Sequence, residues 1–293
     1  MKIIDCFMYF DEDMMLDIRL NILNKFVSHF VICEAAFNHK GIPKKLNFNI
    51  NNFSKFKNKI SYIVADKQPR TLREVNKNDD ENKRNSKILD NALIRENYQR
   101  NYLTNKLTEF SDDDLIIIND LDEIPNLNNF KYKNKITIFK QKMFYYKLNL
   151  VYPNFLWSGS KICKKKDLIS PQWLRNVKSK KYPLWRLDSF FSRKKYSDIN
   201  FVENGGWHFT NIKNAEQIDY KMKNFLHHLE YERSGISIED IKKNIQEKKI
   251  IYDHFADKRK NRVISTGKLE RLNINDLPEY ISKNTNKFQE WID

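Results

Sequence analysis

Four short apolar runs in the first half of the chain constrain its fold most strongly. They cover residues 3–10, 30–33, 60–64 and 115–118, and segments with apolar residues at helical spacing, such as 14–26 and 86–110, lie between them. Strands that alternate with helices form βαβ units, and such units build parallel sheets. We therefore expect an α/β fold with a mainly parallel central sheet.

The second half repeats this pattern less regularly. Residues 136–149 and 155–163 are predicted strands, and residues 215–231, 238–248 and 277–291 are predicted helices, so we expect a helical C-terminal part. The composition does not change along the chain, which indicates a single domain over residues 1–293. The charged segment 66–86 has few apolar anchors, so we expect a mobile loop that is either a lid over a ligand or a surface insertion.

The net charge of +15, from 53 basic against 38 acidic residues, favours anionic partners. Lysines bind phosphate backbones, so a basic nucleic-acid-binding protein without catalysis is one alternative. However, the basic residues are dispersed along the chain, as an AT-rich genome would impose, and nucleic acid is not the partner we expect. Weak attraction to an anionic membrane surface remains an alternative.

Export and membrane-span signals are weak in this sequence. The N-terminus turns acidic after eight residues, too soon for a signal peptide, and no apolar run approaches the roughly 20 residues of a spanning helix. Cys6, Cys33 and Cys163 are widely spaced, which favours buried thiols over disulfides. We therefore expect a cytoplasmic protein, either free or peripheral to the inner membrane face.

Three carboxylates follow the strand at 115–118, in the sequence LIIINDLDEIP. Asp120, Asp122 and Glu123 lie at the carboxyl end of that strand, where α/β folds bind ligands. The pattern also fits the capping box of a helix, but Pro125 disfavours a helix there. In an extended segment Asp120 and Asp122 face the same side, and they repel each other unless a cation lies between them. Oxygen ligands select Mg²⁺ or Mn²⁺, and a nucleotide diphosphate would supply further oxygen ligands to the ion.

Other candidates each have a structural alternative. His208 in the sequence GGWH is either a ligand that completes a metal shell or a packed, hydrogen-bonded side chain beside Trp207. Glu34 ends a buried strand, where it contacts a ribose or base or else caps a turn. Several tryptophans either stack on sugar rings or belong to the core: Trp157, Trp173, Trp185 and Trp207.

Five segments together resemble glycosyltransferase family 17. They are DEDMMLDIRLNIL, FVICEAAFNHKGIPKKLNF, DDDLIIINDLDEIP, GGWHFTNI and LPEYISKNTNKF, in that order along the chain. The resemblance implies a GT-A-like nucleotide-sugar-binding fold, a UDP-sugar donor such as UDP-GlcNAc, a divalent metal and inversion at the anomeric carbon. It also implies that residues 1–125 bind the nucleotide-sugar and that residues 126–293 bind a glycan acceptor.

The resemblance also assigns residues. It makes Asp120 and Asp122 the metal and diphosphate residues with Glu123 in support, and His208 an additional metal ligand. The candidate donor-binding residues are Glu12, Arg19, Glu34, Arg100 and Asp120. Arg19 and Arg100 match basic positions of the family and either clamp phosphate or pair with the acids. The stretch 227–230 matches a family segment in an ambiguous register, with an ordinary exposed helix as its alternative.

The acceptor and the catalytic base are less defined. Animal members of the family carry a Golgi anchor and a stem that this sequence does not match, so acceptor identity does not transfer, and a lipid-linked glycan is one option. Inverting transfer requires a base for the acceptor hydroxyl. Asp188 and Glu203 are candidates because of their position in the second half. A different nucleotide-sugar donor, or a nucleotidyltransferase that uses the same acids, is the enzymatic alternative.

Overall fold

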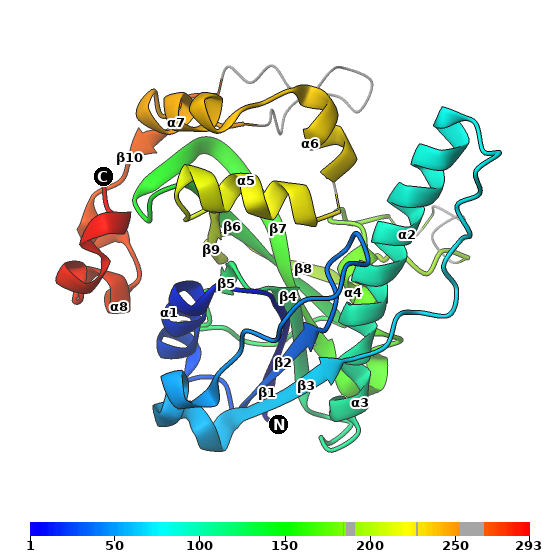
Figure 1. Cartoon of the computed structure of the whole chain (residues 1–293). Helices are drawn as coiled ribbons and strands as arrows, with labels where there is room; N and C mark the ends of the chain where they lie inside the picture. Colours follow the sequence, from blue (N-terminus) through cyan, green and yellow to red (C-terminus); the bar gives the residue numbers. More distant parts are fainter. Residues whose placement is uncertain (184, 186–190, 227, 252–266) are drawn as a thin grey trace.

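The protein has a mixed α/β fold built on one long, curled sheet (Figure 1). The computed structural model describes residues 1–183, 185, 191–226, 228–251 and 267–293. Its first half contains four mutually parallel strands, β1 (Ile3–Tyr9), β2 (His29–Ala35), β3 (Ile60–Ala65) and β4 (Leu115–Asp120). The helices between them are α1 (Asp13–Leu23), α2 (Glu81–Tyr102) and α3 (Thr104–Leu107), with a 3₁₀ segment at Ile50–Lys59. The predicted α/β class is confirmed.

The second half extends the sheet with antiparallel and parallel pairs. Its strands are β5 (Glu123–Pro125), β6 (Ile136–Tyr145), β7 (Leu150–Lys164), β8 (Ile199–Val202), β9 (Gly206–Thr210) and β10 (Glu270–Arg271). The main strand order is β3-β2-β1-β4-β7-β6-β9-β5, and β7 runs antiparallel to β4. The helices are α4 (Pro171–Asn176), α5 (Ala215–Asn224), α6 (His228–Ser234), α7 (Ile238–Gln246) and α8 (Glu279–Ser282).

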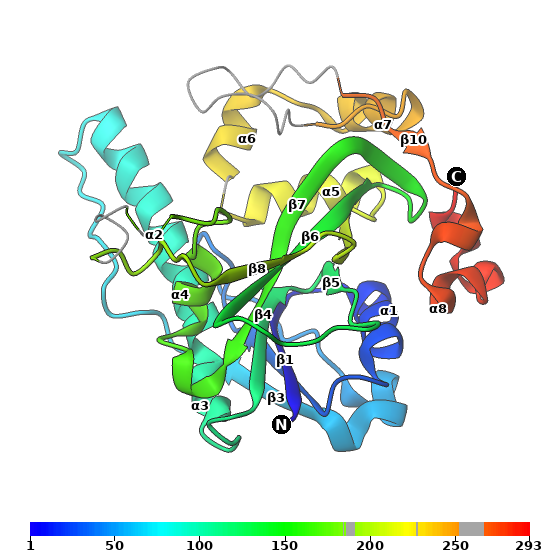
Figure 2. The ribbon, with the colours of Figure 1, turned by 180° about the vertical axis from the view of Figure 1, so that it is seen from behind.

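Helices cover both faces of the parallel part of the sheet. In β4, Leu115 and Ile117 join the core on the α1 side, whereas Ile116 and Ile118 join the core on the α2 and α4 side. Figure 2 shows the same arrangement from behind. All four side chains are almost completely buried, and each contributes roughly 1.5–3 kcal/mol by leaving water. This two-sided burial explains why β4 is a continuous aliphatic run.

Several predicted boundaries are wrong for local reasons. Helix α2 begins at residue 81 because the Asp80 side chain accepts a hydrogen bond from the backbone N–H of Lys83 at 2.8 Å. The predicted helix at 277–291 is divided into α8 and a 3₁₀ segment, Thr285–Trp291. The acids after β4 form a turn at residues 121–122 followed by the extended β5, so the capping-box alternative is also wrong. Among the described residues, no helix is long and apolar enough to cross a membrane.

Candidate functional site

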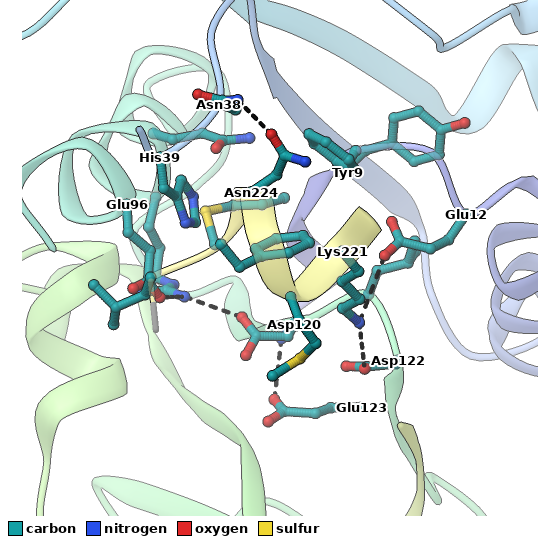
Figure 3. A pocket seen from close by; sticks show the side chains of 18 of the residues that line it. Tyr9, Glu12, Asn38, His39, Glu96, Asp120, Asp122, Glu123, Lys221 and Asn224 are labelled. Atoms are coloured by element: carbon teal, nitrogen blue, oxygen red, sulfur yellow. Dashed lines mark hydrogen bonds and ion pairs between the residues drawn. The ribbon is translucent and has the colours of Figure 1, made fainter. Parts of the chain in front are cut away.

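The carboxyl ends of β1 and β4 meet where the strand order of the sheet reverses. Strands β2 and β3 lie on one side of β1 and β4 lies on the other, which is the arrangement at which α/β sheets bind ligands. A cavity of about 310 Å³, here called the switch-point cavity, lies at this position (Figure 3). Its lining includes residues that follow β1 and residues that follow β4: Phe10, Glu12, Asp120, Asp122 and Glu123.

The carboxylate of Asp120 is paired with two arginines. Its Oδ1 lies 3.0 Å from a guanidinium nitrogen of Arg100, in the last turn of α2, and its Oδ2 lies 2.6 Å from one of Arg175, in the last turn of α4. Burial disfavours the charged carboxylate, but the two guanidinium groups outweigh burial and hold the pKa of Asp120 well below its usual range. Asp120 is therefore an anion whose oxygens are already engaged.

Glu123 is fully buried and shares Arg175 with Asp120. Each carboxylate oxygen of Glu123 lies 2.7 Å from a guanidinium nitrogen of Arg175, in a bidentate pair. The indole N–H of Trp157 donates to Oε1 at 2.5 Å, and the backbone N–H of Asp120 donates to Oε2 at 3.0 Å. Arg175 is thus a cation that allows these two carboxylates to lie close together.

Asp122 faces a second pair of cationic groups. Nε2 of His208 lies 3.5 Å from Oδ1. The amine of Lys221 lies 3.9 Å from Oδ2 and 3.8 Å from Oε1 of Glu12 (Figure 3). Burial favours the neutral forms of Asp122 and His208, but their attraction prevails, so the pKa of His208 is raised and that of Asp122 is lowered. These separations are long for hydrogen bonds, so Asp122 is not held by direct hydrogen bonds in the way that Asp120 and Glu123 are held by Arg175.

The pairing of β5 with β9 positions His208. In this antiparallel pair His208 lies opposite Glu123, and Ile124 lies opposite Trp207. Gly206 has φ = +122°, and a Cβ atom there would lie 2.1 Å from the carbonyl oxygen of Ile124. A glycine is therefore required for β9 to approach β5 this closely. The structure brings His208 to Asp122, as the GGWH sequence suggested.

Arg19 lies beneath the site and has no exposed surface. Its guanidinium pairs with Asp5 at 2.6 and 2.8 Å and donates to the carbonyl oxygens of Asp120, Leu121 and Glu123 at 3.2, 3.0 and 2.7 Å. This burial excludes direct contact between Arg19 and a nucleotide-sugar. Arg19 instead holds the backbone turn that carries the acidic side chains.

Glu34 is also buried and serves the neighbouring loop. Its carboxylate accepts hydrogen bonds from Lys44, from the backbone N–H groups of Asn47 and Phe48, and from the Tyr62 hydroxyl at 2.8 Å. This arrangement corresponds to the turn-capping alternative for Glu34. The segment that it anchors contributes Lys44 to the lining of the switch-point cavity.

Aromatic side chains also line the switch-point cavity. The ring of Phe225 lies 5.2 Å from that of Phe10 and 5.3 Å from that of His39, measured between centroids. Burial lowers the pKa of His39 to about 4, so this imidazole is neutral at pH 7. The Nδ2 of Asn38 donates to Oδ1 of Asn224 at 2.7 Å, which joins the loop after β2 to the end of α5 (Figure 3). The cavity therefore combines aromatic rings with charged groups, and the amine of Lys221 lies 5.4 Å from the ring centroid of Phe225.

The remaining candidates are not all at the site. Asp188 and His227 fall outside the described residues. Glu203 is exposed after β8 and is not among the described residues that line the cavity. Of the four candidate tryptophans, Trp157 lines the cavity, Trp173 and Trp207 pack in or against the core, and Trp185 is 81% exposed. Residues 66–86 do not contribute to the described lining, so the lid interpretation gains no support.

Several residues at the site gave no signal in the sequence. Arg175 lies in a six-residue helix without apolar periodicity, 55 positions from Asp120. Lys221 is one of many lysines, although its place on the predicted helix at 215–231 marked it as part of an ordered element. His39 follows a predicted strand in a loop, where periodicity carries no information. Phe225 lies within the predicted helix at 215–231, which the structure ends at Asn224.

The arrangement differs from the expected ion site in one respect. Asp120 and Glu123 meet guanidinium groups, which leaves Asp122 and His208 as the pair able to contact a metal ion. Within the described parts of the chain, no group of three or more His, Cys, Asp or Glu side chains is placed to hold a metal. One carboxylate and one imidazole nevertheless suit Mn²⁺ or Mg²⁺ when substrate phosphates and water supply the other ligands. The residues present fit an ion bound together with a diphosphate.

Comparison with known proteins assigns the class. The sequence profile of glycosyltransferase family 17 matches residues 1–292. A stretch of 119 residues, 38% of this chain, is 30% identical to the human β-1,4-mannosyl-glycoprotein 4-β-N-acetylglucosaminyltransferase and 29% identical to the mouse protein of that name. The match spans 19% of each relative. The protein is a glycosyltransferase. It belongs to glycosyltransferase family 17.

Proposed function

We propose that this enzyme transfers N-acetylglucosamine from UDP-GlcNAc to a glycan acceptor, with inversion and with a divalent metal ion, on a GT-A-like fold. The observation that carries the proposal is the position of Asp122, His208 and Lys221 in a cavity at the switch point of the sheet. The donor sugar follows the names of the relatives. Another UDP-sugar is the alternative within the same class.

The aromatic and charged groups of the switch-point cavity suit the two parts of a nucleotide. A nucleobase stacks on aromatic rings, which Phe10 and Phe225 supply, and the neutral His39 adds a polar contact beside them. The diphosphate then lies near Lys221 and Asp122. Asp122 and His208 would hold a divalent ion, and that ion would supply positive charge for the departing diphosphate. The amine of Lys221 adds a further positive charge beside Asp122.

The surrounding residues keep this geometry fixed. Arg175 and Arg100 hold Asp120, and Arg19 holds the backbone from residue 120 to residue 123, so Asp122 is presented on a rigid turn. Rigid placement matters because, if the side chains of an ion site become ordered only on binding, the entropy that they lose reduces the affinity. The arginine pairs therefore contribute to donor binding indirectly.

A thermal-shift panel tests the proposal. UDP-GlcNAc, UDP-galactose, UDP-glucose and UDP should be compared, each with Mn²⁺ and each with EDTA. The expected result is a rise in melting temperature with UDP-sugars that requires Mn²⁺ and is largest for UDP-GlcNAc. Stabilisation by DNA or RNA without any response to UDP-sugars would instead support the nucleic-acid-binding alternative.

A further inference from the structure

A second cavity of about 210 Å³ lies beside the switch-point cavity. Four residues line both cavities: Glu12, Leu121, Asp122 and Lys221. These residues therefore form the partition between the two spaces. A molecule in the second cavity would lie next to Asp122 and Lys221, where the bond to the diphosphate is proposed to break.

The lining of the second cavity suits a sugar ring. Trp291 offers an aromatic face, while Asn211, Gln217 and Lys213 offer polar groups, and the amine of Lys213 lies 2.7 Å from Oδ1 of Asp11. Sugars are recognised by such a combination of one aromatic surface with a few fixed hydrogen-bonding groups. The volume is smaller than the roughly 300–1,000 Å³ of sites for drug-sized ligands, which matches a single ring rather than a nucleotide.

Three consecutive carboxylates after β1 border this cavity, and their surroundings differ. Asp13 engages both oxygens, one with the hydroxyl of Tyr9 and the other with Asn52 at 3.0 Å. Asp11 accepts from Lys213 and lines the second cavity. Glu12 lines both cavities; its Oε2 accepts from the backbone N–H of Asp11 at 3.3 Å, and its Oε1 lies 3.8 Å from Lys221. Glu12 is thus held only by long contacts, at 3.3 and 3.8 Å, and it is the one of the three at the partition.

We propose that the second cavity receives the terminal sugar of the acceptor and that Glu12 is the catalytic base. This inference rests on the proposed function. Glu12 accepts the proton of the acceptor hydroxyl as that oxygen forms a bond to the anomeric carbon of the donor. The bond from the anomeric carbon to the diphosphate oxygen breaks at the same time, and its electron pair leaves with UDP. Glu12 replaces Asp188 and Glu203 as the candidate for this step.

The base assignment is tested with Glu12→Gln, which keeps the size of the side chain and removes its charge. Asp17→Asn is the matched control, because Asp17 lies on α1 and pairs with Lys287 at 2.6 Å, outside both cavities. Transfer from UDP-GlcNAc to a panel of p-nitrophenyl hexosides is measured, together with UDP-GlcNAc affinity. If the panel is refused, hydrolysis of the donor is scored instead, since water also needs a base.

For Glu12→Gln we expect a rate at least tenfold lower, with a loss on the order of 10²–10⁴ for a general base, and donor affinity within threefold of the wild type. Asp17→Asn should keep its rate within twofold. A loss smaller than tenfold overturns the base assignment. A parallel loss of donor affinity also overturns it, because Glu12 would then belong to the donor site.

The acceptor subsite is tested with Lys213→Met. The Michaelis constant for the hexoside should rise at least fivefold while that for UDP-GlcNAc stays within twofold. An unchanged Michaelis constant for the hexoside overturns the acceptor subsite. The subsite is also overturned if no hexoside of the panel accepts N-acetylglucosamine or inhibits hydrolysis of the donor. A wild-type protein that binds no UDP-sugar overturns the proposed function itself. Normal donor binding with fully active Glu12→Gln and Lys213→Met overturns this inference alone.

Discussion

Arg175 places one guanidinium nitrogen 2.6 Å from Oδ2 of Asp120, and the same group forms a bidentate pair with the buried Glu123. The crowding of acids after β4 is therefore balanced by an arginine from α4. Burial alone would lower the pKa of Arg175, but the attraction of Asp120 and Glu123 raises that pKa instead. Asp120, whose pKa is lowered, and Arg175 are consequently both charged over the whole physiological range.

Removing Arg175 should destabilise the fold. Arg175→Met leaves Asp120 and Glu123 without their shared cation, and breaking a buried ion pair on one side costs about 3–5 kcal/mol. Urea denaturation measures this change in the free energy of unfolding. The control is Arg233→Met, which removes an exposed pair with Glu81 and should cost less than about 1 kcal/mol. Equal costs for the two variants would contradict a structural role for Arg175.

A buried lysine behind the site should make stability depend on pH. Lys161 donates to the carbonyl oxygens of Arg175 and Val177 at 2.6 Å, and burial, followed by repulsion from Arg175, lowers its pKa to about 7. The unfolded chain, with an ordinary pKa near 10.5, binds more protons between these values, so stability should rise as the pH increases from 7 towards 10.5. The contribution is absent from Lys161→Met.

This prediction is measured as a difference in slope. Urea denaturation of the wild type and of Lys161→Met between pH 7 and pH 9 should give slopes that differ by up to about 1.4 kcal/mol per pH unit. Lys161→Met will also be less stable at every pH, since two buried carbonyl groups lose their donor. Parallel pH profiles for the two proteins would show that Lys161 does not change its protonation on folding.

His208 should give opposite pH effects in the free and bound states. Its pKa is raised, so the pair with Asp122 stabilises the ligand-free fold below about pH 6.5 and loses this contribution as the pH rises through the raised pKa. Metal-dependent UDP binding should instead weaken as the pH falls, because a proton competes with the ion for the imidazole. His208→Gln should abolish both effects. UDP titrations with Mn²⁺ at pH 5.5 and 7.5 measure the effect on binding, and the same pH dependence in the wild type and in His208→Gln would contradict a ligand role for His208.

The charge of the chain predicts weak membrane attraction. With a net charge of +15, the protein should co-sediment with anionic vesicles at low salt and only weakly with neutral ones, since each suitably placed Lys or Arg contributes about 1 kcal/mol. Binding should decay towards physiological salt, where the Debye length is about 8 Å. Equal sedimentation with phosphatidylserine and phosphatidylcholine vesicles at low salt would contradict a role for the charge in membrane binding. The lysines would then be dispersed over the surface without a membrane function.

The sequence predicted the longer strands well because burial on both faces requires continuous apolar runs, as in β4. It did not predict the short strands β5, β8, β9 and β10. It also located Asp120 and Asp122 at the end of a strand, since the aliphatic run ends there. It did not reveal which cation neutralises the acids, because Arg175 reaches Asp120 through tertiary packing of a short helix. Trp291 and Lys213 were missed for the same reason: they come to line the second cavity together with Glu12 only through tertiary packing of segments far apart in the sequence.

One consequence corrects a simple expectation about Asp120. Two carboxylates that repel each other would make removal of either nearly neutral for stability. Asp120 is instead held by Arg100 and Arg175, so Asp120→Asn should be destabilising and is a poor probe of ligand binding. Asp122 is the better probe, because its partners lie at 3.5 and 3.9 Å.

Calorimetric titration of UDP with and without Mn²⁺ tests the donor site most directly. The wild type and Asp122→Asn are compared with Asp113→Asn, an exposed acid at the opposite end of β4 that pairs with Lys164 at 2.9 Å. We predict that UDP binds the wild type and Asp113→Asn at least tenfold more tightly with Mn²⁺ than with EDTA, and that Asp122→Asn loses this difference. Equal UDP affinity in Mn²⁺ and EDTA for the wild type, or an unchanged metal dependence in Asp122→Asn, would contradict a metal-assisted diphosphate site at Asp122.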